Sequence, residues 1–313
     1  MPELRKRIMR LLGRFPRRPP LRLRVEARQE GDGFVRERVT YFVESGERVA
    51  AYLLYPNGLA NPAPGIVAAH QHAGQFYLGK SEPAGLTANR MYHYGLDLCR
   101  RGYVVVCPDH LAFEERRPAE FERAENGSLE GGNYERFVAM AYILRGSSLQ
   151  AKYLDDLARA IDVLQSRPEV DKDSIGAIGH SLGGQETLWL AWFDDRVKAA
   201  VSSCGFGMIS TVLRERINHN MATYVPGLLA VCDMDEIVAG LPPKAFLMTS
   251  GEQDRIFPID GVRQIAERGR AAYLEAGVPE RFRSEIFPAG HSLPDEMKAI
   301  AYGWFDRWLK NTA

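Results

Sequence analysis

The segment from residue 174 to residue 184 constrains the fold of this chain more than any other. It reads Ser-Ile-Gly-Ala-Ile-Gly-His-Ser-Leu-Gly-Gly, and residues 185–192 continue it with a helical pattern. A serine on a strained turn between a strand and a helix needs small residues two positions away on both sides, and Gly179 and Gly183 meet that need. The sequence therefore predicts a buried strand, a sharp turn that presents Ser181, and a helix.

Two interpretations of Ser181 are open at this point. In an ordinary doubly wound sheet, a glycine-rich turn would use the serine only as a helix cap. As a nucleophile, the serine requires a base and an acid elsewhere in the chain, because a hydroxyl is weakly nucleophilic at its own pKa. The N–H of Leu182 would then point at the space where an oxyanion forms. The second interpretation is favoured if suitable partners follow.

Such partners do follow, at the ends of two later predicted strands. One strand ends in a polar turn that carries Asp254, and the last strand ends in a glycine and His291. A Gly-x-x-Asp turn after a strand favours Asp254 as the acid, with Glu252 and Asp260 as alternatives. The chain order is therefore Ser181, then the acid, then the histidine.

This order is the one found in α/β-hydrolases. From about residue 40 to the C-terminus, the order of predicted elements resembles the dienelactone-hydrolase-like and acetyl-xylan-esterase-like group of that superfamily. The resemblance implies an α/β fold with a mostly parallel central sheet, helices on both faces and a small cap formed by insertions. Dienelactone hydrolases have cysteine where this chain has Ser181, so their lactone substrate is not carried over.

The resemblance also implies roles for the three residues. Ser181 would attack an acyl carbon, His291 would take its proton and return it to the leaving group, and Asp254 would orient the imidazole. The expected enzyme is a serine esterase that cleaves carboxylic esters, with short acyl groups, through an acyl-enzyme. A peptidase or amidase of the same fold is the alternative, and a ligand-binding protein without catalysis is a further one.

The loop after the predicted strand at residues 64–69 is expected to supply the second oxyanion donor. By position in related hydrolases, that donor is the backbone N–H of His72, with Gln71 and Ala73 as alternatives. If His70 and His72 shared one face of a strand, they would instead suit a metal ion. No further ligands at metal-binding spacing accompany them, so we expect neither a metal nor an organic cofactor.

The remaining histidines receive no catalytic role. His180, beside the predicted nucleophile, is expected to pack against neighbouring strands. His110 follows a predicted strand end, and whether it faces the site is left open. His93 and His219 lie in segments that the pattern does not place.

The length and the net charge of the chain limit the kinds of partner it is expected to have. At 313 residues and 45% hydrophobic content, the chain is long enough for one catalytic domain, expected over residues 35–313. Lys plus Arg and Asp plus Glu number 40 each, so nothing in the net charge favours nucleic acid. The expected partner is a small-molecule ester.

The cysteines and the N-terminal sequence indicate the cellular compartment to be expected. Four cysteines without Cys-x-x-Cys spacing are expected to be free thiols in a reducing compartment: Cys99, Cys107, Cys204 and Cys232. No apolar leader and no run long enough to cross a bilayer is seen. We therefore expect a cytoplasmic protein without a membrane span.

Residues 1–34 form a basic segment in which arginines alternate with apolar residues before a cluster of prolines. One interpretation is a helix that binds a membrane surface or an anionic partner. The favoured one is an amphipathic helix docked on its own domain or on a second subunit, which makes a homodimer possible.

Two stretches exceed the minimal fold and are expected to form the cap. They span residues 111–150 and 205–240, between predicted elements of the core, and a hairpin over residues 35–56 opens the sheet. Insertions at these places commonly roof the site and set substrate choice, and surface decoration or a dimer contact is the alternative. Four residues favour a partly apolar pocket wall, although a buried core explains them equally well: Phe206, Met208, Met221 and Tyr224.

Overall fold

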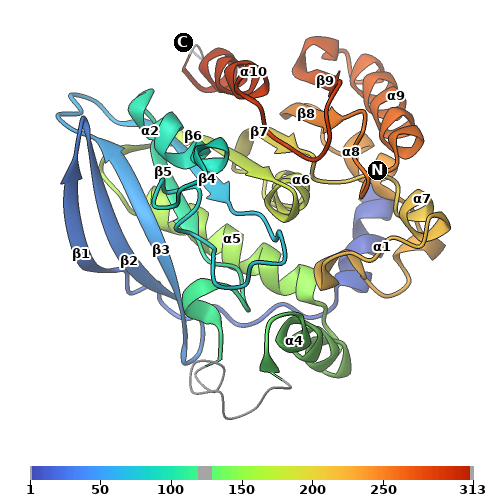
Figure 1. The fold of residues 1–313 in the computed structure, drawn as a ribbon, viewed down its shortest axis with the longest axis horizontal. Coiled ribbons are helices and arrows are strands. Elements are labelled where there is room, and N and C mark those ends of the chain that lie inside the picture. The colour runs from blue at the N-terminus through green and yellow to red at the C-terminus, as the bar shows by residue number, and fades with distance from the viewer. Residues whose placement is uncertain (1, 119–128, 311–313) are drawn as a thin grey trace.

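A computed structural model describes residues 2–118 and 129–310 of the chain (Figure 1). Its centre is a nine-stranded sheet with the order β1-β2-β3-β5-β4-β6-β7-β8-β9. The strands are β1 (Arg24–Gly31), β2 (Phe34–Glu44), β3 (Glu47–Pro56), β4 (Ala63–Ala69), β5 (Val104–Pro108), β6 (Val170–His180), β7 (Val197–Ser203), β8 (Ala245–Gly251) and β9 (Phe282–Phe287).

The sheet is antiparallel at one end and parallel through the rest. β1, β2, β3 and β5 pair antiparallel, whereas every pair from β5 to β9 is parallel. β4, β5 and β8 are buried along their whole length, as expected for apolar strands covered on both faces. The predicted hairpin is present as β2 and β3, and Gly46 takes a positive φ of 82° in its two-residue turn.

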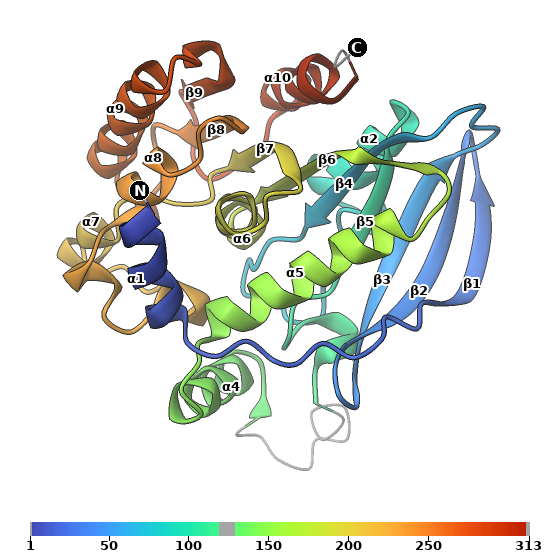
Figure 2. The ribbon, with the colours of Figure 1, turned by 180° about the vertical axis from the view of Figure 1, so that it is seen from behind.

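Helices cover both faces of the sheet. They are α1 (Pro2–Leu12), α2 (Tyr94–Arg100), α4 (Gly132–Leu144), α5 (Leu149–Gln165), α6 (Leu182–Phe193), α7 (Ile209–Arg214), α8 (Met234–Ala239), α9 (Ile259–Glu275) and α10 (Asp295–Phe305). α2 and α10 pack on one face, and α5, α6 and α9 pack on the other (Figures 1 and 2). The predicted fold class is confirmed: a mostly parallel sheet between two helical layers.

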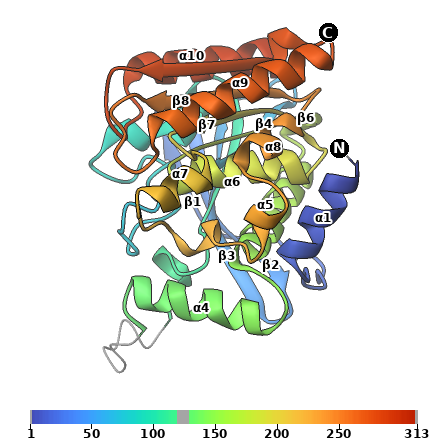
Figure 3. The ribbon, with the colours of Figure 1, turned by 90° about the vertical axis from the view of Figure 1, so that its right-hand side faces the viewer.

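The N-terminal segment contains both a docked helix and a strand. Ile8 and Leu12 of α1 are fully buried, and Phe15 stacks on Phe193 at the end of α6 with ring centroids 5.2 Å apart. α1 therefore lies on its own domain, at the edge of the molecule (Figure 3). The sheet begins earlier than expected, because β1 pairs with β2 and carries a β-bulge after Val25.

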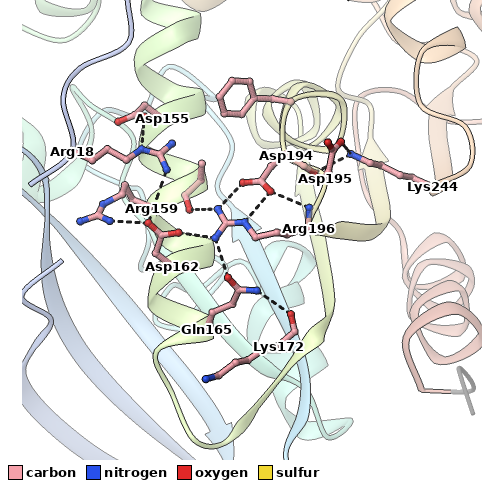
Figure 4. Close-up of polar contacts among 12 residues, drawn as sticks. Arg18, Asp155, Arg159, Asp162, Gln165, Lys172, Asp194, Asp195, Arg196 and Lys244 are labelled. Carbon is pink, nitrogen blue, oxygen red and sulfur yellow. Dashed lines mark hydrogen bonds and ion pairs between the residues drawn. The ribbon is translucent and has the colours of Figure 1, made fainter. Parts of the chain in front are cut away.

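A charged network joins this segment to the helices beneath the sheet (Figure 4). Arg196, in the turn before β7, bonds Asp194 and Asp162, each at 2.6 Å. Arg18, in the extended chain after α1, bonds Asp155 of α5 at 2.7 Å. The network links the N-terminal segment, α5 and the C-terminal end of α6, so the helix that follows Ser181 is held at its far end.

Two segments extend from the core toward the edge where the parallel strands end. The first includes α4, although residues 119–128 of the expected cap lie outside the described residues. The second runs through α7, a 3₁₀ turn at Met221–Thr223 and α8. In the described part of the chain, no helix is long and apolar enough to cross a membrane.

The four cysteines are all free. Cys99, Cys107 and Cys204 are buried, whereas Cys232 is partly exposed. Of the four residues expected in a pocket wall or core, Phe206 and Met208 are buried in the main core, Tyr224 is partly exposed, and Met221 lines a cavity of about 870 Å³.

Candidate active site

Ser181 lies on a strained turn between β6 and α6. Its φ of 56° and ψ of −121° are unfavourable for a residue with a side chain. A Cβ on Gly179 would lie 2.2 Å from the carbonyl of Gly183, and a Cβ on Gly183 would lie 2.0 Å from the carbonyl oxygen of Ala69. Glycine is therefore required at both positions, and the predicted strand, turn and helix are present.

Asp254 and His291 meet at the ends of β8 and β9. His291 Nδ1 donates to Asp254 Oδ2 at 2.7 Å, and Asp254 Oδ1 accepts from the backbone N–H of Ile256 at 3.0 Å. The two loops touch, because a Cβ on Gly251 would lie 2.2 Å from the carbonyl oxygen of Gly290. This geometry fixes the ring orientation of His291 and leaves its Nε2 free to face the cavity.

The two alternative acids lie elsewhere. Glu252 is half exposed and pairs with Arg263, and Asp260 is exposed and pairs with Arg214. Of the three carboxylates considered, Asp254 alone contacts His291 in the described residues.

Ser181 and His291 open into a cavity of about 870 Å³. Its walls come from the loop after β4, the segment before α2, α4, and residues 218–221. No hydrogen bond joins Ser181 to His291 among the described contacts, which is common in hydrolases without substrate because such bonds tighten only in the complex. The cavity therefore brings together a strained serine and an oriented imidazole.

The backbone amides considered as oxyanion donors have no hydrogen-bond partner. Neither Leu182 N–H nor His72 N–H donates to any residue in the described chain, and the same holds for the alternatives Gln71 and Ala73. The loop of His72 turns sharply, since Ala73 and Gly74 take positive φ values of 46° and 68°. The His72 ring accepts from the N–H of Gly74 at 3.0 Å and contacts Glu135 at 3.2 Å. These contacts fix the loop next to the serine.

Comparison with known proteins identifies the family of the chain. The sequence model of the dienelactone hydrolase family matches residues 49–302. The chain belongs to the dienelactone hydrolase family. It is 30% identical over 315 residues to the Bacillus subtilis (strain 168) protein named "Putative hydrolase YtaP", covering 98% of this chain and 99% of that protein.

Solved structures share the fold of this family member at low identity. The glucuronoyl esterase from Solibacter usitatus superposes with a TM-score of 0.71 and 18% identity, over 97% of this chain and 91% of that one. The acetyl xylan esterase from Paenibacillus sp. R4 gives 0.65 and 17%, over 93% and 90%. The expectation of a hydrolase enzyme with an α/β-hydrolase fold is confirmed.

The structure of this hydrolase does not support the alternative of a metal pair at His70 and His72. His70 and His72 do not share a strand face, because β4 ends at Ala69 and only His72 lines the cavity. The His70 ring is fully buried, with Nδ1 donating to the carbonyl of Gln71 and Nε2 accepting from the N–H of His110. Both of its nitrogens are occupied, so it has no lone pair for a metal ion.

Three other histidines of the hydrolase are held by packing and hydrogen bonds. His110 does not face the cavity but is buried between His70 and Tyr153. His180 packs as expected against a neighbouring strand, with Nδ1 3.0 Å from Ser203 Oγ. His219 lines the cavity, where its Nε2 donates to the carbonyl of Ile256.

Two buried glutamates at the cavity were not found from the sequence. Glu135 of α4 contacts His72 through one oxygen and accepts from the N–H of Met221 through the other, so it ties both cap segments to the loop after β4. Glu82 accepts from the side-chain amide of Gln71 at 2.9 Å. Burial raises the pKa of Glu82 to about 7, although the bond from Gln71 opposes the shift.

Proposed function

We propose that this protein is a serine carboxylesterase that cleaves esters of short acyl groups through an acyl-enzyme. Ser181 is the nucleophile, His291 the general base and then the general acid, and Asp254 the residue that orients the imidazole. The observation that carries the proposal is the opening of Ser181 and the Asp254-bonded His291 into one cavity. The family membership and the esterase neighbours support ester hydrolysis.

The first half of the reaction forms the acyl-enzyme. His291 Nε2 takes the proton of Ser181 as the hydroxyl oxygen attacks the ester carbonyl carbon. The tetrahedral oxyanion then accepts from the N–H groups of Leu182 and His72, which have no hydrogen-bond partner among the described residues. As the intermediate collapses, His291 gives its proton to the departing alcohol.

The second half repeats these steps with water. A water molecule gives its proton to His291 and attacks the acyl carbon, and Ser181 leaves with that proton. The hydrogen bond from His291 Nδ1 to Asp254 stabilises the imidazolium in both halves. The cap segments that contribute Glu135 and Met221 to the cavity wall form its roof.

Covalent labelling tests the nucleophile directly. A fluorophosphonate should add one phosphonyl group to the protein, and peptide mapping by mass spectrometry should place it on Ser181. EDTA should change neither the labelling nor the hydrolysis of p-nitrophenyl acetate. A label on another residue, or hydrolysis that persists in the fully labelled protein, would contradict the proposal.

Replacing Asp254 by asparagine should lower kcat by about 10³–10⁴-fold, because the amide stabilises the wrong imidazole tautomer and does not stabilise the imidazolium. Steady-state kinetics with p-nitrophenyl acetate measures the loss. Glu252→Gln is the matched control, since Glu252 pairs with Arg263 on the surface, and its kcat should stay within about twofold. Equal losses in the two variants would rule out the assignment of the acid.

The alternative function is cleavage of amides by the same residues, and kinetics can distinguish an amidase from an esterase. The p-nitroanilide with the same acyl group provides the comparison. An esterase should cleave it at least about a thousandfold more slowly than the p-nitrophenyl ester, because amine departure needs closer protonation by His291. Comparable rates for the two would favour the amidase.

A further inference from the structure

One wall of the cavity is polar and incompletely hydrogen-bonded. Gln71, Glu82 and Tyr92 line it, and their side chains are at least nine-tenths buried. In the described chain, Glu82 Oε2, Gln71 Oε1 and the Tyr92 hydroxyl have no hydrogen-bond partner, yet none of the three atoms is sealed from the cavity. Among the described residues, no Lys or Arg side chain pairs with Glu82. Buried polar atoms are rarely left unpaired unless a ligand or water meets them.

The polar wall lies on the histidine's side of the nucleophile. The ring of Tyr92 stacks on His180 at 4.8 Å, and His180 lies 4.7 Å from the ring of His291. Since His291 hands its proton to the departing alcohol, the alcohol part of the ester has to lie beside this wall. Phe76 and Met221 also line the cavity, and their apolar side chains suit a short acyl chain.

We propose that Glu82, Gln71 and Tyr92 form a subsite for an alcohol that carries further hydroxyl groups next to the ester oxygen. This inference rests on the proposed function and adds a substrate class to it. Glu82 Oε2 and Gln71 Oε1 accept from such hydroxyls, and the Tyr92 hydroxyl both donates and accepts. Glu82 selects through hydrogen bonds, because an alcohol without hydroxyls leaves its buried oxygen unpaired.

The protonation of the wall agrees with a hydroxyl ligand. Burial and the nearby Glu82 raise the pKa of Tyr92 to about 12, so its phenol keeps its proton. Burial also holds the pKa of Glu82 near 7, which makes it a weak counterion for a cation. Both groups therefore remain available for hydrogen bonding around neutral pH.

Two acetates of matched size test the subsite. Glycerol 1-acetate and propyl acetate share the acyl group and the carbon chain and differ by two hydroxyls, and a pH-stat follows both reactions. The wild type should show kcat/KM about tenfold or more higher for glycerol 1-acetate, as expected for hydrogen bonds to a partly charged, buried group. Equal values for the two acetates would overturn the proposal.

Three variants test which residues cause the preference for glycerol 1-acetate over propyl acetate. Glu82→Gln should reduce the preference about tenfold, mainly through the KM of glycerol 1-acetate. Tyr92→Phe, which removes one hydroxyl and keeps the stacked ring, should reduce it about threefold or more. Arg136→Gln removes a charge elsewhere at the cavity and should leave the substrate preference unchanged. If Glu82→Gln lowers kcat/KM for both acetates equally, Glu82 acts only by positioning Gln71. That result would refute the subsite.

Two further arms separate the remaining explanations. Acetylcholine and its uncharged analogue 3,3-dimethylbutyl acetate differ in a cation, so a preference for acetylcholine that Glu82→Gln removes would refute a hydroxyl site in favour of a cation site. Ser181→Ala should lower kcat for propyl acetate by about 10⁴-fold or more. Hydrolysis at a rate close to that of the wild type in Ser181→Ala would refute the serine mechanism, whereas a missing hydroxyl preference with intact Ser181 dependence would refute the subsite alone.

Discussion

Replacing Ser181 by alanine should lower kcat for p-nitrophenyl acetate by about 10⁴–10⁶-fold, the largest kinetic loss expected from any single change in this chain. The variant keeps the cavity, the two unpaired amides and the Asp254–His291 pair, but it has no oxygen to acylate. A small rate above that of water should remain, because the oxyanion donors and the binding of substrate do not depend on the hydroxyl. Stopped-flow and steady-state assays measure the rate of the wild type and the residual rate of the variant.

The same variant separates a serine mechanism from metal-assisted hydrolysis. Its circular dichroism spectrum and melting temperature should match those of the wild type, since alanine removes a single oxygen. Activity that survived in Ser181→Ala and disappeared with EDTA would contradict the serine mechanism. That outcome would direct attention to Cys204, Asp254 and His291, whose ligand atoms lie within 4.8 Å of one another.

Gly183→Ala should produce the largest loss of stability, about 3 kcal/mol or more of the free energy of unfolding. The new Cβ would lie 2.0 Å from the carbonyl oxygen of Ala69 and 2.8 Å from that of His70. Both contacts are with backbone, so α6 would have to move away from β4 and the turn at Ser181 would be lost. Urea unfolding followed by fluorescence gives the free energy, and activity should fall together with it.

Gly303→Ala is the matched control for this change. Gly303 lies on an exposed position of α10, and nothing approaches within 4 Å of the place where its Cβ would be. The alanine should raise the free energy of unfolding by up to about 1 kcal/mol, because glycine disfavours a helix interior. A stable Gly183→Ala variant would show that α6 and β4 can separate without cost, against the close contacts described above.

The serine turn and its two partners could be predicted because each is marked by a local pattern. Ser181 has glycines two positions away on both sides, Asp254 follows the buried strand β8, and His291 follows β9, in which only the two end residues are buried. Parallel strands bring their carboxyl ends to one edge, so the order of elements was enough to place the three residues together. The meeting of Asp254 and His291 is the part of this prediction that the geometry reproduces most directly.

Other features depend on contacts that no local pattern records. Glu135 is one of several charged residues near α4, and its role arises from His72 and Met221, 63 and 86 positions away in the chain. Glu82 lies in a segment of turns without periodicity. The alternative of a metal pair at His70 and His72 required that they share a strand face, and they do not, because alternation holds only inside a strand and β4 ends at Ala69. β1 was missed because seven of its eight residues are exposed and give no apolar alternation.

The exposed strand at the antiparallel end of the sheet has a consequence for association. An open edge offers unpaired backbone groups to any other extended chain, and proteins commonly protect such edges with charges and bulges. β1 has both, since Arg24, Glu26, Arg28 and Glu30 alternate along it and the bulge after Val25 interrupts its register. This edge is therefore protected against sheet extension and aggregation, and it is poorly suited to a dimer of the hydrolase that pairs two edge strands.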